Sequence, residues 1–408
     1  MAEKQIETDI IVVGGGYVGL SIALAVKMAA PHISINVLDG APESAIERET
    51  RASAIAAAAC RMLDQLGVWQ EIAANAQPIN EMIITDSKLS DVVRPVFLTF
   101  PATDKNEPFA HMIANEDLIK SLRARARALG VLLHHDTIVT DQQINGNEAR
   151  VITGSGDQYC GKLIVAADGV RSRLRQAVGI KTMHWSYDQV GIVTTVRHER
   201  THNGVAQEHF LPAGPFAILP LKGHRSSLVW TESTRNAERI LAMDDFQFEL
   251  ELEQRFGHKL GEIEVERARR GFPLGLTLAR EFVRHRFALA GDAAHGIHPI
   301  SGQGLNLGFM DAAALSQTIV EADRLGLDIG GLTILENYQT WRRFDTVRMG
   351  VVTDVLNRLF ANDNPLIRAA RDFGLSVVDR LPGLKNQLIN QAAGQSSTAP
   401  NLLQGKAI

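Results

Sequence analysis

A triplet of glycines near the N-terminus constrains the fold of this chain more than any other feature. Gly14, Gly16 and Gly19 form the pattern G-x-G-x-x-G. The triplet follows residues 9–13, an apolar, β-branched run of the kind that forms a strand buried on both faces. Residues 20–30 come next and are Ala-rich, which favours a helix. The sequence therefore predicts a strand, a tight turn and a helix in succession.

A second strand completes a parallel βαβ unit. Residues 33–38 are again apolar, and Asp39 follows Gly19 by 20 positions. In such a unit Gly14 permits the turn, and Gly16 lets the backbone approach a pyrophosphate. The start of the helix favours phosphate groups, and an acid at the end of the second strand binds a ribose hydroxyl. These features together predict a dinucleotide site.

Two later motifs favour FAD over NAD as the dinucleotide. The first, residues 167–175 (ADGVRSRLR), follows an apolar run and resembles the Asp-Gly motif of aromatic-hydroxylase flavoproteins; the alternative interpretation is a plain turn at a strand end. The second begins with Gly291 and Asp292, after the apolar run 287–290. An acid in that position can accept a hydrogen bond from a ribitol or ribose hydroxyl.

A glycine-rich turn at residues 299–304 then opens another helix. The free N–H groups at its start, from Gly304, Leu305 and Asn306, carry partial positive charge. This charge favours the pyrimidine end of a reduced flavin, which is anionic. The candidate residues of this flavin-side loop are Pro299, Gly302, Gln303 and Gly304.

Metal and disulfide chemistry are not expected. His295 and His298 are close in sequence, but no third ligand completes a recognisable zinc site. The two cysteines, Cys60 and Cys160, have no metal-ligand spacing and cannot form a disulfide framework. This cysteine usage suits a reducing cytoplasm.

The chain is expected to divide into a cofactor domain and an inserted domain. Alternating runs separated by Gly and Pro, between residues 180 and 272, indicate antiparallel sheet. The expected fold class is α/β: a Rossmann-like FAD-binding domain, an inserted α+β substrate domain and a C-terminal helical region. The expected boundaries are 1–78, 108–179 and 281–345 for the FAD-binding domain, 79–107 and 180–280 for the substrate domain, 346–393 for the C-terminal helices, and 394–408 for a flexible tail.

Residues 51–74 are Ala-rich and are expected to be helical, with Leu63, Leu66 and Trp69 on one face. A further helix is expected at residues 116–128.

The motifs taken together resemble those of group A flavin monooxygenases, specifically the ubiquinone-biosynthesis hydroxylase family. The resemblance covers nearly the whole chain and continues weakly through residues 359–385. Its motifs are 291–295 (GDAAH), 298–299 (HP), 302–308 (GQGLNLG), Asp311 and 272–274 (FPL).

The resemblance implies FAD as cofactor, and it implies contacts at the positions that match the family's motifs. In this family Arg51 would approach the flavin, Asp168 would lie near the pyrophosphate, and Asp292 would contact the linker. The full set is Gly14, Gly16, Gly19, Asp39, Arg51, Asp168, Gly291, Asp292, Gly304, Leu305 and Asn306.

Two positions depart from the family pattern. Asp39 is shorter than the usual Glu, and Ala114 stands where a charged residue is common. The second departure leaves the contacts of Asn115 and Leu118 open.

The resemblance also implies an activity. It is hydroxylation of the aromatic ring of a polyprenylated phenol in ubiquinone biosynthesis, through reduced flavin and a C4a-hydroperoxide. The partners would be O2 and either NAD(P)H or another electron donor. Phe210, Phe216 and Trp230 are candidates for a roof over the substrate, with ordinary core packing as the alternative. No residue for phenol deprotonation stands out.

Other functions stay open. They are hydroxylation of another phenol, a flavin dehydrogenase, and a non-catalytic flavoprotein subunit. The ring position, the tail length and the oligomeric state are not decided by the sequence.

Charge and hydropathy bear on location and partners. The net charge of −4 gives no reason to expect nucleic acid, and no signal peptide or spanning segment is expected. A cytoplasmic protein is expected, with peripheral contact to membrane and to other ubiquinone-biosynthesis proteins as a further possibility. Residues 364–391 alternate apolar clusters with basic residues and could contact anionic lipid; capping of the cofactor domain is the equal alternative.

Overall fold

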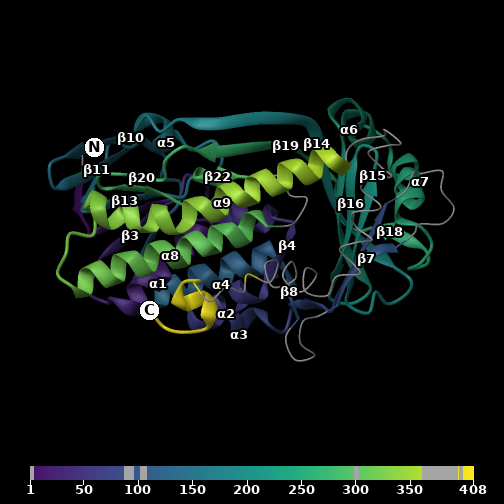
Figure 1. Cartoon of the computed structure of the whole chain (residues 1–408), viewed down its shortest axis with the longest axis horizontal. Coiled ribbons are helices and arrows are strands. Elements are labelled where there is room, and N and C mark those ends of the chain that lie inside the picture. The colour runs from purple at the N-terminus through teal and green to yellow at the C-terminus, as the bar shows by residue number, and fades with distance from the viewer. Residues whose placement is uncertain (1–3, 87–95, 102–107, 298–302, 361–393, 395–397) are drawn as a thin grey trace.

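A six-stranded sheet forms the centre of the larger body (Figure 1). The structure is a computed structural model that describes residues 4–86, 96–101, 108–297, 303–360, 394 and 398–408. The two middle strands are buried over their whole length, which explains their apolar sequence. Every pair in the sheet is parallel except β20 with β21. In order the strands are β20 (Val283–Arg284), β21 (Phe287–Leu289), β13 (Leu163–Ala166), β2 (Ile10–Val13), β3 (Ile35–Leu38) and β9 (Leu132–His134).

The predicted βαβ unit is confirmed as β2, α1 and β3. Helix α1 (Tyr17–Ala29) buries its side chains from Gly19 to Val26 and packs against α8 and α4. Beside α8 lies the long helix α9, which extends to the second sheet (Figure 1). The other helices of this body are α2 (Ala57–Gln65), α3 (Trp69–Ile72), α4 (Asn115–Ala128), α5 (Arg173–Ala177), α8 (Gly304–Arg324), α9 (Leu332–Phe360) and the 3₁₀ turns η1 (Glu43–Arg48) and η2 (Gly291–Ala293).

The expected helix at 51–74 is only partly correct. Strand β4 (Ala52–Ala56) occupies its first part, and α2 and α3 follow. Alanine favours helix, but the backbone of β4 pairs with β8 (Ala110–Ala114) in a sheet completed by β5 (Gln77–Ile79). Tertiary pairing thus overrides local propensity here.

A nine-stranded sheet forms the second body, and its pairs are antiparallel, as predicted, except that β15 (Val205–Leu211) and β6 (Glu81–Asp86) are parallel. Helices α6 (Thr234–Leu241) and α7 (Asp245–Phe256) lie with it on the right of Figure 1. Their buried side chains share a hydrophobic core with Phe216 and Trp230 of the sheet. The strands in order are β22 (His295–Gly296), β19 (Arg270–Ala279), β14 (Thr182–His198), β17 (Arg225–Ser233), β16 (Gly214–Leu221), β15 (Val205–Leu211), β6 (Glu81–Asp86) and β7 (Val96–Pro101), with β18 (Ile263–Val265) paired to β14.

A smaller sheet lies at the edge of the first body. It contains β1 (Gln5–Glu7), β12 (Gln158–Gly161), β11 (Glu148–Thr153) and β10 (Val139–Asn145). No helix among the described residues is long and apolar enough to cross a membrane.

The C-terminal residues correct the expectation of a frayed tail. Residues 398–408 include a 3₁₀ turn, η4 (Asn401–Gln404), that packs against α2 and α8. Leu402 and Leu403 join the main core, with 4% and 2% of their surface exposed. Arg61 donates to the Leu403 carbonyl oxygen at 3.1 Å. The two leucines offset the polar composition that suggested disorder.

Truncating one of these two leucines tests whether the tail contributes to stability. Leu403→Ala should lower the free energy of unfolding by about 2–4 kcal/mol, because a buried leucine leaves a cavity. Urea unfolding followed by circular dichroism measures the change. The exposed Lys406→Ala serves as control and should stay within about 0.5 kcal/mol of the parent. If the tail were frayed, both variants would instead have the same free energy of unfolding as the parent.

Candidate active site

In the glycine turn between β2 and α1, two of the three glycines have no room for a side chain, and the third has open space beside it. Gly14 has φ of +113°, and a Cβ there would lie 2.2 Å from the Ala167 carbonyl oxygen. A Cβ on Gly19 would lie 2.0 Å from the Gly14 oxygen. A Cβ on Gly16 would meet nothing within 4 Å. The first and third glycines therefore serve the fold, and the second faces free space in which a pyrophosphate fits.

Asp39 lies at the end of β3, as predicted, but it has a partner that the sequence did not reveal. Its Oδ2 accepts from Arg123 Nη2 of α4 at 3.4 Å, and its Oδ1 accepts from the Ala41 amide at 3.1 Å. Arg123 is buried, with 7% of its surface exposed. Four carboxylate lone pairs leave room for a ribose hydroxyl as well.

Asp168 follows β13 and caps the turn that leads into α5. Its Oδ2 accepts from the Arg173 amide at 3.1 Å, and its buried Oδ1 has no partner among the described residues. A Cβ on Gly14 would lie 3.1 Å from the Asp168 amide nitrogen, so the first two motifs adjoin. A direct contact between Asp168 and the cofactor stays a prediction.

The turn after β21 depends on a buried charge cluster around Asp311 of α8. Asp311 Oδ2 accepts from the Gly291 amide at 2.9 Å and from His295 Nε2 at 2.5 Å. Its Oδ1 accepts from Arg342 Nε of α9 at 2.8 Å. His295 and Asp311 have no exposed side-chain surface, and Arg342 has 3%. His295 is therefore held by Asp311, and this contact gives no support to a zinc site at this histidine.

The cluster places Asp292 at the surface beside the glycine turn. Asp292 is exposed, yet the surrounding protein desolvates its carboxyl and raises its pKa, against the influence of His295 and Arg51. Burial alone would also raise the pKa of Asp311, but His295 and Arg342 outweigh it and lower that pKa. A Cβ on Gly291 would lie 2.9 Å from Val18 of α1, so this turn adjoins the glycine triplet.

Asn306 at the start of α8 is bound to β4. Its Oδ1 accepts from the Ala56 amide at 2.9 Å, and its Nδ2 donates to the Ala54 carbonyl oxygen at 3.0 Å. This arrangement fixes the start of α8. Gln303 precedes the helix, and its own side chain makes no capping hydrogen bond. Contacts of Gly304, Leu305 and Asn306 with a flavin stay predictions.

Arg51 and Tyr17 converge on the same region. Arg51 is paired with Glu49 through two bonds of 2.9 and 2.6 Å, and its guanidinium lies 5.1 Å from the ring centroid of Phe272. Tyr17 has a buried hydroxyl without a partner among the described residues. Burial raises its pKa, with Glu49 and Asp292 adding to the effect. Sequence reasoning missed Tyr17 because it occupies a variable position of the triplet.

Some predicted residues lie outside the described part of the chain. They are His298, Pro299 and Gly302, together with the basic segment 364–391. Within the described ranges, no group of three His, Cys, Asp or Glu residues could hold a metal.

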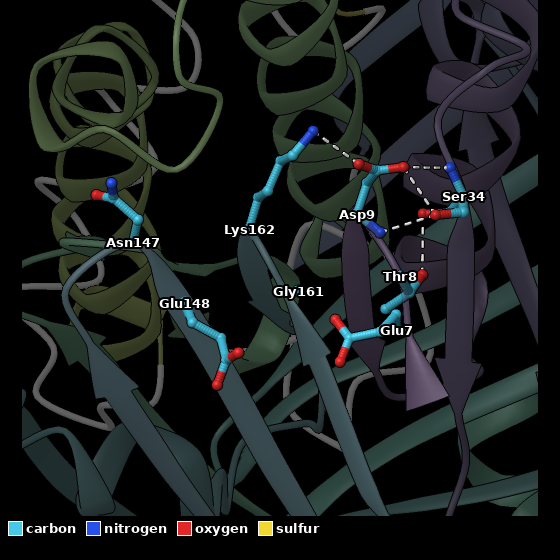
Figure 2. A pocket seen from close by; sticks show the side chains of 8 residues that line it. All are labelled: Glu7, Thr8, Asp9, Ser34, Asn147, Glu148, Gly161 and Lys162. Carbon is cyan, nitrogen blue, oxygen red and sulfur yellow. Dashed lines mark hydrogen bonds and ion pairs between the residues drawn. The ribbon is translucent and has the colours of Figure 1, made fainter. Parts of the chain in front are cut away.

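A separate polar pocket of about 400 Å³ lies at the other end of the parallel sheet (Figure 2). Its lining includes Asp9, which accepts from the Ser34 amide and hydroxyl and pairs with Lys162 at 2.8 Å. Ligands of doubly wound sheets bind at the carboxyl ends of the strands. This pocket adjoins the amino ends and is not the cofactor site.

The residues at the carboxyl ends fit FAD. Gly16 offers free space at a helix start, Tyr17 has an orphaned buried hydroxyl, and Asp292 has an accessible carboxyl. All three lie where β2 and β21 end, beside α1. The fold and the site define an FAD-binding protein.

The comparisons with known proteins agree. The chain belongs to the FAD binding domain family, whose model matches residues 7–343. The crystal structure of p-nitrophenol 4-monooxygenase PnpA from Pseudomonas putida DLL-E4 shares the fold, with a TM-score of 0.78 at 20% identity. That match covers 96% of this chain and 99% of the other.

Among the chain's relatives are hydroxylases of ubiquinone biosynthesis. Ubiquinone hydroxylase UbiL of Rhodospirillum rubrum is 39% identical over 396 residues, which cover 96% of this chain and 91% of UbiL. The 3-demethoxyubiquinol 3-hydroxylase of Escherichia coli is 31% identical over 95% of this chain and 98% of its own. The resemblance seen in the sequence is confirmed: the chain is an FAD-dependent monooxygenase of the ubiquinone-biosynthesis hydroxylase type.

Two glycine substitutions separate the cofactor role from the structural role. Gly16→Val should fold, because its Cβ meets open space and its φ of −82° suits any residue, yet weaken FAD binding by about 100-fold, roughly 3 kcal/mol. Gly19→Val should fail to fold, because its Cβ would overlap the Gly14 oxygen. Flavin fluorescence titration and circular dichroism measure the two outcomes. Normal FAD affinity in folded Gly16→Val would contradict the assignment.

The buried cluster generates a stability prediction. Asp311→Asn should cost about 3–5 kcal/mol of unfolding free energy, because the buried Arg342 loses its counter-charge. Asp345→Asn is the control: Asp345 is a half-exposed partner of the same arginine at 3.7 Å, and its loss should cost at most about 1 kcal/mol.

The same cluster predicts a pH dependence. The pKa of Asp311 is lower in the folded protein than its ordinary 3.8. Its stabilisation is therefore complete above that ordinary value and is lost as pH falls through the lower, folded-state pKa. Urea unfolding of the parent and Asp311→Asn across acidic pH should show converging stabilities. A gap that stays constant at low pH would contradict this role.

Proposed function

We propose that this enzyme hydroxylates the aromatic ring of a polyprenylated phenol, a precursor of ubiquinone, with O2 and with NAD(P)H or another donor. The observation that carries the proposal is the similarity to ubiquinone-biosynthesis hydroxylases over nearly the full length of both chains. The converging glycine turn, Asp292 turn and α8 start support it, because they are the parts that hold FAD in such an enzyme.

When bound, FAD supplies the oxygen chemistry, and the chain supplies position, charge and dryness. Gly16 and the start of α1 would hold the pyrophosphate, and Asp292 would accept from a hydroxyl of the linker. The start of α8 would place partial positive charge near the part of the flavin that becomes anionic on reduction. Arg51, held by Glu49 against Phe272, lies on the boundary between the cofactor body and the sheet.

The division into domains is part of this proposal. Residues 1–78, 108–179 and 281–345 would bind the cofactor, and 79–107 with 180–280 would cover the substrate. Of the three candidate roof aromatics, Phe216 and Trp230 lie in the core under α6 and α7 and cannot serve as a roof. Phe210 lies on the other face, against Ile84 and Leu356.

We further propose that the substrate is taken from a membrane surface. A long isoprenoid tail is insoluble in water, so the ring must reach the enzyme from a bilayer or a partner protein. The enzyme would then act in the cytoplasm as a peripheral membrane protein.

One experiment tests both proposals. Purified, FAD-loaded protein is mixed with NADH, ¹⁸O₂ and a polyprenylphenol in anionic liposomes. We expect a product with one ¹⁸O atom, detected by mass spectrometry, and we expect the protein to sediment with the liposomes. Flavin turnover that yields no labelled product would contradict hydroxylation of a polyprenylphenol. Protein that stays in the supernatant would contradict the membrane proposal.

A further inference from the structure

A buried carboxyl group lies on the face of the nine-stranded sheet that meets the cofactor body. Glu208 of β15 has only 6% of its surface exposed. It makes no hydrogen bond or ion pair with any residue that the structure describes. A buried acid without a partner is costly for a fold. Its presence therefore calls for a function.

The register of the sheet fixes the direction of this side chain. Residues two apart on a strand share a face, so Glu208 points the same way as Ala206 and Phe210. The cross-strand neighbours of Glu208 are Ile84 on β6 and Ala217 on β16. All four neighbours are apolar. Asp86, which pairs with Phe210 two positions further along β6, shares this face and is also buried.

Two hydrophobic clusters flank Glu208 on this face. On one side, Ala206 packs with Met112 and Ala54, which belong to β8 and β4. On the other side, Phe210 packs with Leu356 and Leu359 near the end of α9. Asn306 at the start of α8 hydrogen-bonds to β4. Glu208 therefore lies on the face of the sheet that is turned toward β4 and the start of α8.

We propose that Glu208 is the group that accepts the proton of the substrate's phenolic hydroxyl. This inference rests on the proposed function, because it requires a phenol in the space between sheet and cofactor body. The O–H bond of the phenol breaks and its proton moves to a Glu208 carboxylate oxygen, while the electron pair stays on the phenolate. The phenolate then donates electron density into the ring, which makes a ring carbon a better nucleophile. The apolar neighbours would receive the ring and the start of the tail.

The acidity of the group suits this task. Burial raises the pKa of Glu208 to about 8, which approaches the value of about 10 for a phenol. A proton therefore passes between the two with a small penalty, whereas an ordinary carboxylate would be a far weaker base. The titratable residues on the packed elements are Asp86 and Glu81 on β6, His111 on β8, and Asp354 and Arg358 near the end of α9, of which the last two pair with each other. Desolvation is the cause of the shift, and no charged neighbour contributes to it.

The test uses flavin-loaded holoenzyme and a short-tailed 2-prenylphenol. In single turnovers with prereduced flavin and O2, product formation by the parent should rise with pH and inflect near 8, where the carboxyl ionises. Glu208→Gln should form product about 100-fold more slowly or worse, with no inflection, while its flavin is reduced normally. Glu208→Asp should recover part of the rate together with the pH dependence. Glu264→Gln, an exposed acid on β18 of the same sheet, should match the parent.

A binding measurement keeps the inference testable without turnover. Oxidised holoenzyme is titrated with 4-nitrophenol, whose phenolate absorbs visible light, across pH 5 to 10. 4-Nitrophenol is a stronger acid than Glu208, so it binds as the phenolate while Glu208 is still protonated. Ionisation of Glu208 near pH 8 then places a carboxylate beside the phenolate, so nitrophenolate affinity should fall above about pH 8 in the parent and stay level in Glu208→Gln. The same pH profile of affinity in both proteins, or full activity with the parent pH profile in Glu208→Gln, would overturn the assignment. A parent enzyme that makes no product from any prenylphenol would overturn the proposed function instead, and the nitrophenol titration would still decide on Glu208.

Discussion

The ion cluster around Asp311 holds together the parts on which the site depends. One buried carboxylate accepts from the Gly291 amide, from His295 and from Arg342. The first two partners lie four residues apart, in the turn after β21 and in β22, and the third lies on α9, so three stretches of the chain meet at this one side chain of α8. Isolated, such a charge would be strongly disfavoured in the interior. Three donors hold the Asp311 carboxylate in place. Because one of them is the Gly291 amide, this carboxylate also sets the position of the exposed Asp292.

The sequence predicted the cofactor half of the molecule well, because there the chemistry is local. A glycine triplet, an acid after a strand and a GDAAH turn each place a function within a few residues, and the structure brings the three together. Partners supplied from elsewhere were not predictable. Arg123 and Arg342 approach Asp39 and Asp311 from helices far along the chain, and arginines on helices are usually solvated.

Less could be predicted from the sequence about the second body, which contains the nine-stranded sheet. Its antiparallel character follows from alternation along the strands, but alternation cannot say which face meets the cofactor. Phe216 and Trp230 were plausible contacts by type, yet they pack under α7, while Glu208 was hidden in an ordinary strand. The strand at β4 and the packed C-terminus also differed from expectation, since pairing with β8 and burial of Leu403 depend on residues that composition does not reveal.

The long strand β14 has a consequence for the cooperativity of the whole molecule. It spans 17 residues, about 55 Å of extended chain, and pairs with β19 from Thr182 to Val193, with a bulge between Ser186 and Gln189. Near Thr182 this ribbon adjoins β22, whose His295 belongs to the Asp311 cluster, and beyond Gln189 it pairs with β17 inside the nine-stranded sheet. A hinge between the two bodies would have to break this ladder. We therefore expect the cofactor body and the nine-stranded sheet to unfold as one cooperative unit.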